Sequence, residues 1–290
     1  MKILFTIPHY YNPESGGRYG STRNNPAQRI KALKRCISSI HSLFGEKQFN
    51  LDIASHSAIP VNDLQKNEID IAVVTVKDKY LLKDLNINPE LYTHREVITD
   101  SMMLGFECKK VLAQNFSKYD YYCYLEDDLI INDPWFFTKL KWFNKLTNDG
   151  YLLQPNRFEV STGNIADKVY VDGNLRIQAT EKFQDITDSQ ILTGIVMEEK
   201  ILFKRALNPH SGCYFLNQNQ LKNWMEQSYF EENDISFIGP LESAATLGIM
   251  KTFKVYKPEP HSFLEILHSG TSFLNLVGNK VKIAKEQVIR

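Results

Sequence analysis

The chain has 290 residues, which is enough for one large domain or two small ones. Hydrophobic residues make up 43% and charged residues 23%, and these proportions exclude a disordered tail, a collagen-like fibre and a coiled coil. The 34 Lys and Arg residues balance the 34 Asp and Glu residues, whereas a protein that coats nucleic-acid phosphates usually carries a basic excess. We therefore expect a soluble globular protein without a nucleic-acid partner.

The first half of the sequence alternates strand and helix patterns. Residues 2–7 predict a buried strand, and a loop with three glycines follows at 15–21. Asn25 as N-cap and Pro26 in the first turn predict a helix that ends at Gly45. The further elements expected here are strands at 49–54, 69–76 and 121–125, and a helix at 97–115 with Ile98 and Met102 on its inner side. This order predicts an open α/β sheet with right-handed crossovers.

The pattern loosens after about residue 130, and shorter elements follow. The expected elements are helices at 135–146, 221–227 and 241–250, and strands at 151–153, 168–171, 213–216 and 253–256. We find no internal repeat, no low-complexity tract and no clear linker. We therefore expect one mixed α/β domain over residues 1–290, with a mostly parallel sheet flanked by helices.

The sequence contains no apolar stretch approaching the ~20 residues that a membrane-spanning helix requires. The apolar run at 2–7 is too short for a signal peptide, so we expect a cytoplasmic chain. Peripheral contact with the inner face of a membrane stays open, because apolar residues at 135–137 and 263–267 could be exposed. No cysteine belongs to a CxxC pair, and buried free thiols are expected at Cys36, Cys108, Cys123 and Cys213.

Three consecutive carboxylates, Glu126, Asp127 and Asp128, follow the apolar strand pattern at 121–125 and precede another apolar run. We expect them at the carboxyl end of a strand, where α/β sheets hold ligands. Carboxylates this close repel one another unless a cation lies between them, and a hard divalent ion can also bridge to a diphosphate. An acidic turn exposed to water is the alternative, since charge runs are usually solvated. The apolar flanks favour a metal site.

These motifs resemble those of the GT-A glycosyltransferases, over roughly residues 1–135. The run Leu125-Glu126-Asp127-Asp128-Leu129 resembles the variant of their Asp-x-Asp motif found in the animal N-acetylglucosaminyltransferase I family. The pattern Arg29-x-x-Ala32-Leu33-x-x-Cys36-Ile37-x-Ser39-Ile40 resembles the first helix of many such enzymes. The resemblance implies a GT-A (Rossmann-like) fold, with a nucleotide-binding half at 1–130 and an acceptor-binding and catalytic half at 131–290.

The resemblance also implies roles for individual residues. In the family the last acid of the motif binds the metal ion, which makes Asp128 the expected primary ligand. Asp127 is then expected to contact the ribose or a metal-bound water, and Glu126 to lie on the nucleotide side. Arg29 is expected to bind the nucleotide sugar. The nucleotide base is expected to lie against the loop Pro8-His9-Tyr10-Tyr11 after the first strand, with Pro8, Tyr10 and Tyr11 as the contacts.

An inverting transfer requires a general base that takes the proton from the acceptor hydroxyl. Inverting GT-A enzymes supply an Asp or Glu downstream of the acidic motif, and Glu242 fits at the start of the helix expected after Gly239 and Pro240. The helix dipole favours an ionised carboxylate there, although Glu242 could simply stabilise its helix. Glu232 and Asp234 are rival candidates.

Several GT-A families carry a C-terminal His that completes the metal shell, and His268 resembles that residue, with His261 as a competitor. Imidazole suits Mn²⁺ better than Mg²⁺, so Mn²⁺ is the preferred divalent cofactor. Arg157 is expected to contact the donor sugar or the acceptor, although a surface Arg is the alternative. Further candidates are Arg18 and Arg23 for the diphosphate, and the segment starting at His210 for the acceptor side.

The leading hypothesis is a metal-dependent glycosyltransferase that moves a sugar, with inversion, from a nucleotide-diphosphate sugar to an acceptor hydroxyl. UDP-sugars are the favoured donors, and a carbohydrate or a lipid-linked glycan is the expected acceptor. The first alternative is a sugar-1-phosphate nucleotidyltransferase, although residues 15–18 lack the spacing of its Gly-x-Gly-Thr-Arg loop. The second is a non-catalytic nucleotide- or carbohydrate-binding protein. A dehydrogenase is disfavoured because no GxGxxG follows the first strand.

Overall fold

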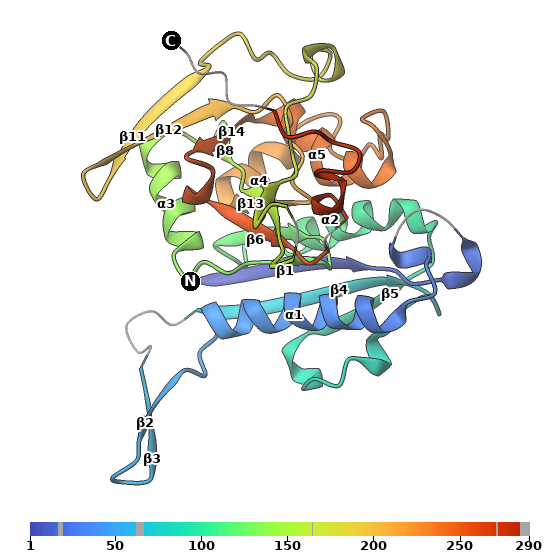
Figure 1. Ribbon diagram of the computed structural model, residues 1–290, viewed down its shortest axis with the longest axis vertical. Helices are drawn as coiled ribbons and strands as arrows, with labels where there is room; N and C mark the ends of the chain where they lie inside the picture. Colours follow the sequence, from blue (N-terminus) through green and yellow to red (C-terminus); the bar gives the residue numbers. More distant parts are fainter. Residues whose placement is uncertain (17–19, 62–66, 164, 271, 285–290) are drawn as a thin grey trace.

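A five-stranded sheet forms the centre of the protein in the computed structural model, which describes residues 1–16, 20–61, 67–163, 165–270 and 272–284. Its strands lie in the order β13-β6-β1-β4-β5 (Figure 1). Their bounds are β1 Lys2–His9, β4 Glu68–Val76, β5 Thr93–Val97, β6 Tyr121–Leu125 and β13 Cys213–Asn217. The first four of these strands are parallel, and β13 runs antiparallel to β6.

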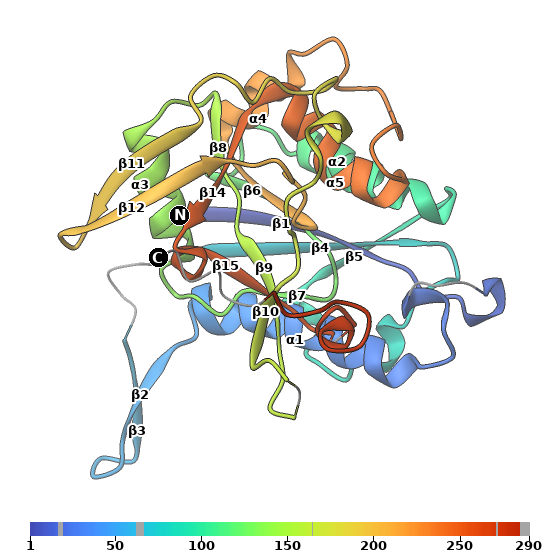
Figure 2. The ribbon, with the colours of Figure 1, turned by 45° about the horizontal axis from the view of Figure 1, so that its top comes forward.

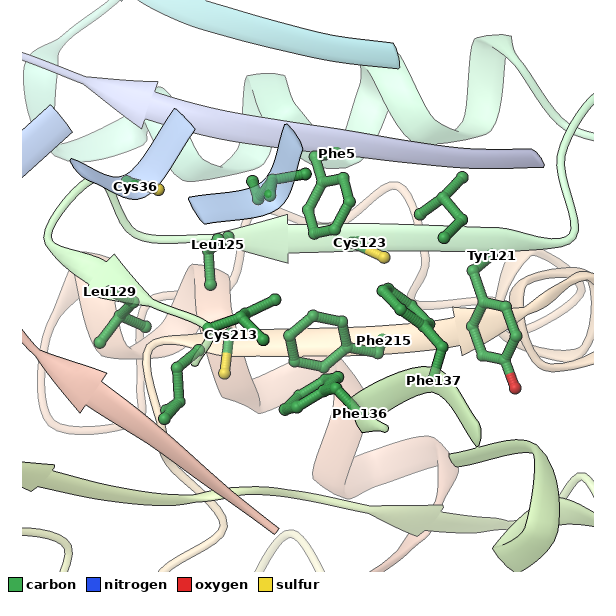
Figure 3. Packing of buried hydrophobic residues seen from close by; sticks show 14 of the residues in the cluster. Phe5, Cys36, Tyr121, Cys123, Leu125, Leu129, Phe136, Phe137, Cys213 and Phe215 are labelled. Atoms are coloured by element: carbon green, nitrogen blue, oxygen red, sulfur yellow. The ribbon is translucent and has the colours of Figure 1, made fainter. Parts of the chain in front are cut away.

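Helices cover both faces of this sheet because its strands are apolar on both faces. The helices are α1 Pro26–Phe44, α2 Leu104–Gln114, α3 Phe136–Leu146, α4 Gln218–Met225 and α5 Pro240–Thr252. Phe5 and Cys123 point to the face covered by α1 and α3, where Phe136, Phe137 and Phe215 also pack (Figure 3). The alternate strand residues point to the opposite face, which α2, α4 and α5 cover. The predicted α/β class with a mixed, mostly parallel sheet is therefore confirmed.

The strand order places a topological switch point between β1 and β6. The chain passes from β1 through α1 to β4 and β5 on one side, and then through α2 to β6 on the other side of β1. The loops at the carboxyl ends of β1 and β6 therefore leave the sheet in opposite directions and open a crevice, which is where ligands bind in open α/β sheets.

A second, four-stranded sheet in the order β10-β9-β15-β7 lies beside this crevice (Figure 2). Its strands are β7 Leu129–Ile130, β9 Asn156–Val160, β10 Lys168–Tyr170 and β15 Glu265–His268. Strand β15 runs parallel to β9 and antiparallel to β7, with His268 opposite Leu129. This register brings the end of β15 to the turn that carries the three carboxylates.

The remaining strands lie farther from the crevice. The sheet in the order β11-β12-β14-β8 contains β8 Tyr151–Leu153, β11 Ile191–Val196, β12 Glu199–Arg205 and β14 Lys254–Glu259. Strands β2 Phe49–Asp52 and β3 Ser57–Pro60 pair only with each other among the described residues, in a hairpin that stands away from the body (Figure 1). The 3₁₀ helices are Pro13–Ser15, Gly20–Thr22, Leu82–Asp84, Pro89–Leu91, Ser101–Met103, Ile177–Ala179, His261–Phe263 and Leu274–Leu276.

The local sequence pattern predicts several elements correctly and misplaces others. The Asn25 side chain accepts a hydrogen bond from the Gln28 N–H, as its prediction as N-cap requires. The strand predicted at 49–54 forms, but it belongs to the exposed hairpin instead of the central sheet.

The helix predicted from residue 97 begins only at Leu104, because Thr93–Val97 pairs with β4 as an edge strand. Ile98 is consequently 90% exposed and not on an inner face.

The apolar stretches considered for membrane contact are mostly packed inside the protein. Phe136, Phe137, Leu264 and Leu267 are buried, and in these stretches only Trp135 is largely exposed. Among the described residues, each helix is too short or too polar to traverse a lipid bilayer. The cysteines are buried free thiols, as expected.

Candidate functional site

A cleft of about 680 Å³ opens at the carboxyl ends of β1 and β6, at the switch point. It brings together most of the residues predicted for the site, namely Pro8, Tyr10, Arg29, Glu126, Asp127, Asp128, Arg157 and Glu242. Tyr11 does not line it: the side chain is buried, and its hydroxyl finds no hydrogen-bond partner among the described residues. Arg18 lies outside the described residues.

Asp127 is the fully paired acid of the turn. Its Oδ2 lies 2.6 Å from His9 Nδ1, and its Oδ1 accepts from the Arg29 guanidinium. The backbone N–H of Leu81 donates to His9 Nε2 at 3.2 Å, so the ring proton of His9 sits on Nδ1 and points at Asp127. Burial opposes the charge of Arg29, but Asp127 and then Asp128 raise the pKa of Arg29 above its ordinary value. Asp127 therefore has no oxygen free for a ligand in this arrangement.

Asp128 is only partly paired. Its Oδ2 lies 3.3 Å from Arg29 Nη1 and 3.6 Å from His268 Nε2. Its Oδ1 is buried and has no hydrogen-bond partner among the described residues. Burial acts to raise the pKa of Asp128, but His268 and Arg29 outweigh burial and lower it. Asp128 is thus a charged carboxylate with one oxygen left for a ligand.

Glu126 and Arg157 face each other on the next side of the cleft, with Arg157 Nη1 3.8 Å from Glu126 Oε2. The other guanidinium nitrogen, Nη2, donates to Asp172 Oδ1 at 2.7 Å, and Lys257 Nζ lies 3.6 Å from Asp172 Oδ2. Arg157 is therefore a buried, anchored cation and not a surface arginine. Burial raises the pKa of Glu126 to about 7, with Arg157 opposing the shift and Asp128 adding to it.

A glycine is required at position 212, because the Glu126 side chain packs directly against it. The Glu126 N–H donates to the Gly212 carbonyl at 3.0 Å, and Gly212 has a φ of 65°. A Cβ at this position would lie 2.4 Å from Glu126 Oε2. Any larger residue would therefore both strain the backbone and displace the carboxylate.

His268 is held from both sides. Its Nδ1 lies 2.7 Å from Glu159 Oε1, while its Nε2 faces Asp128. Burial lowers the pKa of an imidazole, but the ion pair with Asp128 and the hydrogen bond to Glu159 outweigh burial and raise the pKa of His268 to about 10. The competing candidate His261 lies elsewhere, exposed and 3.9 Å from Glu259.

Glu242 lies in the first turn of α5, where it lines the cleft and is half-buried. No ion pair links it to another described residue. The rival candidates Glu232 and Asp234 lie instead beside Lys251, 3.8 Å and 3.5 Å from its Nζ, and do not line the cleft. His210 also lines the cleft: its Nδ1 is hydrogen-bonded to Thr246 of α5 at 2.9 Å, and its carbonyl accepts from Lys257 Nζ at 2.9 Å.

Asp128 and His268 carry donor atoms suited to a divalent ion, but the described side chains do not form a complete set of ligands around one. Among the residues that the structure describes, no three His, Cys, Asp or Glu side chains are grouped to hold an ion by themselves. The unpaired Asp128 Oδ1 and the neighbouring imidazole supply two suitable donors. A small divalent ion commonly takes its remaining ligands from substrate phosphates and water. The proton on His268 would have to leave for Nε2 to coordinate the ion.

The sequence places His9 only in the loop expected against the nucleotide base, and not as the partner of Asp127. It does not indicate the other partners of the site: Glu159, Asp172, Lys257 and Phe273. Arg157 and Glu159 are two residues apart, so a strand prediction for 156–160 would have placed both side chains on one face. The pairing of Arg157 with Asp172 and Lys257 depends on long-range folding, and no local pattern indicates it.

No protein-family model and no curated protein matches this chain. A CMP:2-keto-3-deoxy-manno-octonic acid synthetase complexed with CTP is 12% identical, covers 80% of this chain and 81% of its own, and has a TM-score of 0.32. HddC from Yersinia pseudotuberculosis is 13% identical over 88% of both chains, with a TM-score of 0.38. Mouse xyloside xylosyltransferase 1 in its apo form is 11% identical over 89% of this chain and 85% of its own, with a TM-score of 0.36. Likenesses this distant identify no family, so the function is inferred from the side chains of the cleft.

Proposed function

We propose that this chain is a glycosyltransferase that moves a sugar from a nucleotide-diphosphate sugar to an acceptor hydroxyl. The observation that carries the proposal is the grouping of charges in one cleft at the switch point. Two anchored arginines, Arg29 and Arg157, flank the acidic turn, and Asp128 presents a buried oxygen that has no partner among the described residues. This arrangement suits a ligand that carries both negative phosphates and a cation.

The arginines would bind the diphosphate, because guanidinium groups pair well with phosphate oxygens and remain charged when buried. Asp127 would hold Arg29 in place, and Asp172 would do the same for Arg157. Pro8 and Tyr10, at the end of β1, would lie against the nucleotide base. Asp128 and His268 would hold the divalent ion, Mn²⁺ in preference to Mg²⁺. Such an ion supplies charge that stabilises the departing diphosphate.

Glu242, which lines the same cleft, would act as the general base and take the proton of the acceptor hydroxyl as the hydroxyl oxygen attacks the anomeric carbon. The bond from that carbon to the diphosphate breaks in the same step, and the configuration inverts. Glu242 lies in the first turn of α5, where the helix dipole is favourable for an acidic side chain. UDP-sugars are the proposed donors, and a carbohydrate or lipid-linked glycan is the proposed acceptor.

The test is a calorimetric titration of UDP- and GDP-sugars in MnCl₂ and in EDTA, followed by mass spectrometry of the products. A parallel sample receives nucleoside triphosphates and sugar 1-phosphates. We expect one nucleotide class to bind with Mn²⁺ and the donor to lose its sugar slowly to water. Release of pyrophosphate from a nucleoside triphosphate and a sugar 1-phosphate would instead identify a nucleotidyltransferase. Tight binding without turnover of any donor would identify a binding protein, and absence of nucleotide binding would refute the proposal.

The role of Glu242 is tested separately by Glu242→Gln. General-base catalysis typically contributes about 10²–10⁴-fold, so kcat should fall by that factor while donor affinity stays unchanged. The exposed Asp84→Ala variant, which lies outside the cleft, serves as the control. A full transfer rate in Glu242→Gln would remove Glu242 from the mechanism.

A further inference from the structure

Glu159 of β9 is a fully buried carboxylate beside the cleft, with 0% of its side chain exposed. Removing a carboxylate from water costs free energy unless hydrogen bonds and opposite charge compensate. The proposed transfer does not use this charge directly. Its function must therefore be sought in the groups that it contacts.

The two oxygens of Glu159 bind different partners. Oε1 lies 2.7 Å from His268 Nδ1, and Oε2 accepts a 2.7 Å hydrogen bond from the backbone N–H of Leu274. Because Nδ1 is engaged in this way, the imidazole presents Nε2 toward Asp128. One carboxylate thus ties the end of β15 to the start of the 3₁₀ helix Leu274–Leu276.

The residue before Leu274 reaches the cleft. The Phe273 ring lines the cleft and stands edge-on to the His268 ring, with centroids 6.0 Å apart. It also lies 6.0 Å from the guanidinium carbon of Arg157. The Leu274 side chain is 0% exposed and anchors this position. The placement of Phe273 against both cations therefore depends on the backbone that Glu159 holds.

We propose that Glu159 is a positioning residue for the cleft: one oxygen aims His268 at Asp128, and the other fixes the backbone that places Phe273 beside His268 and Arg157. The metal-directed part of this proposal rests on the proposed function. The hydrogen bond that Glu159 accepts from the backbone N–H of Leu274 is independent of that function. A carboxylate behind a ligating histidine fixes the ring orientation and raises the basicity of the ligand.

The decisive variant is Glu159→Gln, which keeps the shape but offers one acceptor oxygen to two donors. Hydrogen exchange by mass spectrometry should show amides at 272–276 exchanging roughly ten- to a hundredfold faster, as expected for losing a hydrogen bond to a charged group. If the glutamine oxygen stays on Leu274 instead, Mn²⁺ affinity measured by EPR should fall about ten- to a hundredfold. Glu265→Gln is the matched control, because Glu265 lies in the same sheet but pairs with Lys168 and Tyr170.

The proposal is overturned if neither quantity changes, or if exchange rises equally in β1 and β4, which would mark a general loss of stability. Should Glu159→Gln fail to fold, Glu159→Asp replaces it: the charge is kept, but the shorter side chain cannot reach both partners, and the same two readouts apply. Wild-type protein titrated with UDP and Mn²⁺ in the same series separates the two proposals. If it binds neither, the nucleotide-sugar function fails, while the exchange result still decides the role of Glu159 at Leu274.

Discussion

Two adjacent carboxylates, Asp127 and Asp128, have unequal surroundings. Asp127 has both oxygens paired, with His9 and Arg29, and its side chain is 7% exposed. Asp128 is 25% exposed and keeps one oxygen without a partner among the described residues. The difference indicates that Asp127 holds the cleft together, and it fits the role of ligand-binding acid that we propose for Asp128.

The partners of the two acids come from different parts of the chain. His9 and Arg29 belong to β1 and α1, which the central sheet fixes. His268 belongs to β15 in the second sheet, and it is held in turn by Glu159 of β9. Asp127 therefore depends on the packing of the first half alone, and Asp128 joins the two sheets at the cleft.

The largest expected effect on stability belongs to Asp127→Ala. The substitution leaves the buried His9 ring and the Arg29 guanidinium without their main acceptor, and breaking a buried pair in this way costs about 3–5 kcal/mol. Urea unfolding of the variant and of Asp84→Ala measures the difference. A loss below about 1 kcal/mol, the range of exposed pairs, would show that Asp127 does not build the site.

Asp128→Asn should affect binding more than stability. Arg29 keeps Asp127 and His268 keeps Glu159, so the unfolding free energy should fall by only about 1–2 kcal/mol. The affinity for UDP with Mn²⁺ should fall about a hundredfold, equivalent to about 2.7 kcal/mol. Calorimetry together with urea unfolding checks both values. Undiminished affinity would contradict the contrast between the two acids.

Arg29→Lys tests the two acids together, because the Arg29 guanidinium contacts both Asp127 and Asp128. A lysine keeps the charge but lacks the fork that reaches two carboxylates, so about 1.5 kcal/mol of stability should be lost. Donor affinity should weaken by about tenfold. Equal affinity and stability in the variant would mean that bridging by the guanidinium is unimportant.

A pH-dependent effect concerns His210, a partly buried group in the same cleft that is not charged at neutral pH. Burial and then Arg157 lower the pKa of His210 to about 3. Between this value and the ordinary value near 6.5 the unfolded chain binds the proton more readily. The unfolding free energy should therefore fall as the pH decreases from 6.5 toward 3, by roughly 1 kcal/mol per pH unit.

Urea unfolding at pH 7, 6 and 5 measures this slope in wild type and in His210→Asn. The variant should lose the contribution of His210 and show the shallower dependence. Equal slopes in the two proteins would place His210 in a solvated environment instead.

The central part of the fold could be predicted because its signals are local. The apolar runs of β1, β4 and β6 and the capped, periodic helix α1 each specify an element without long-range information. The hairpin of β2 and β3 shows the limit: Phe49 and Leu51 form a strand as expected, but the sequence does not reveal which strand pairs with it. The second sheet was largely missed because β7, β9 and β15 are short and irregularly spaced.

The candidate site could be predicted only where one segment carries it. The acidic turn was located because three carboxylates follow an apolar strand, and Arg29 because it stands in a recognisable helix. The partners His9, Glu159 and Asp172 could not be predicted, since each pairing depends on strand register or on a loop folding back across the sheet.

The most direct test of the central claim is a crystal structure of the protein with UDP and Mn²⁺. We predict that the diphosphate lies in the cleft within hydrogen-bond distance of Arg29 or Arg157, with the ion on the Asp128 oxygen that has no partner among the described residues and on His268. A nucleotide bound elsewhere, with Asp128 still turned only toward Arg29 and His268, would contradict the account.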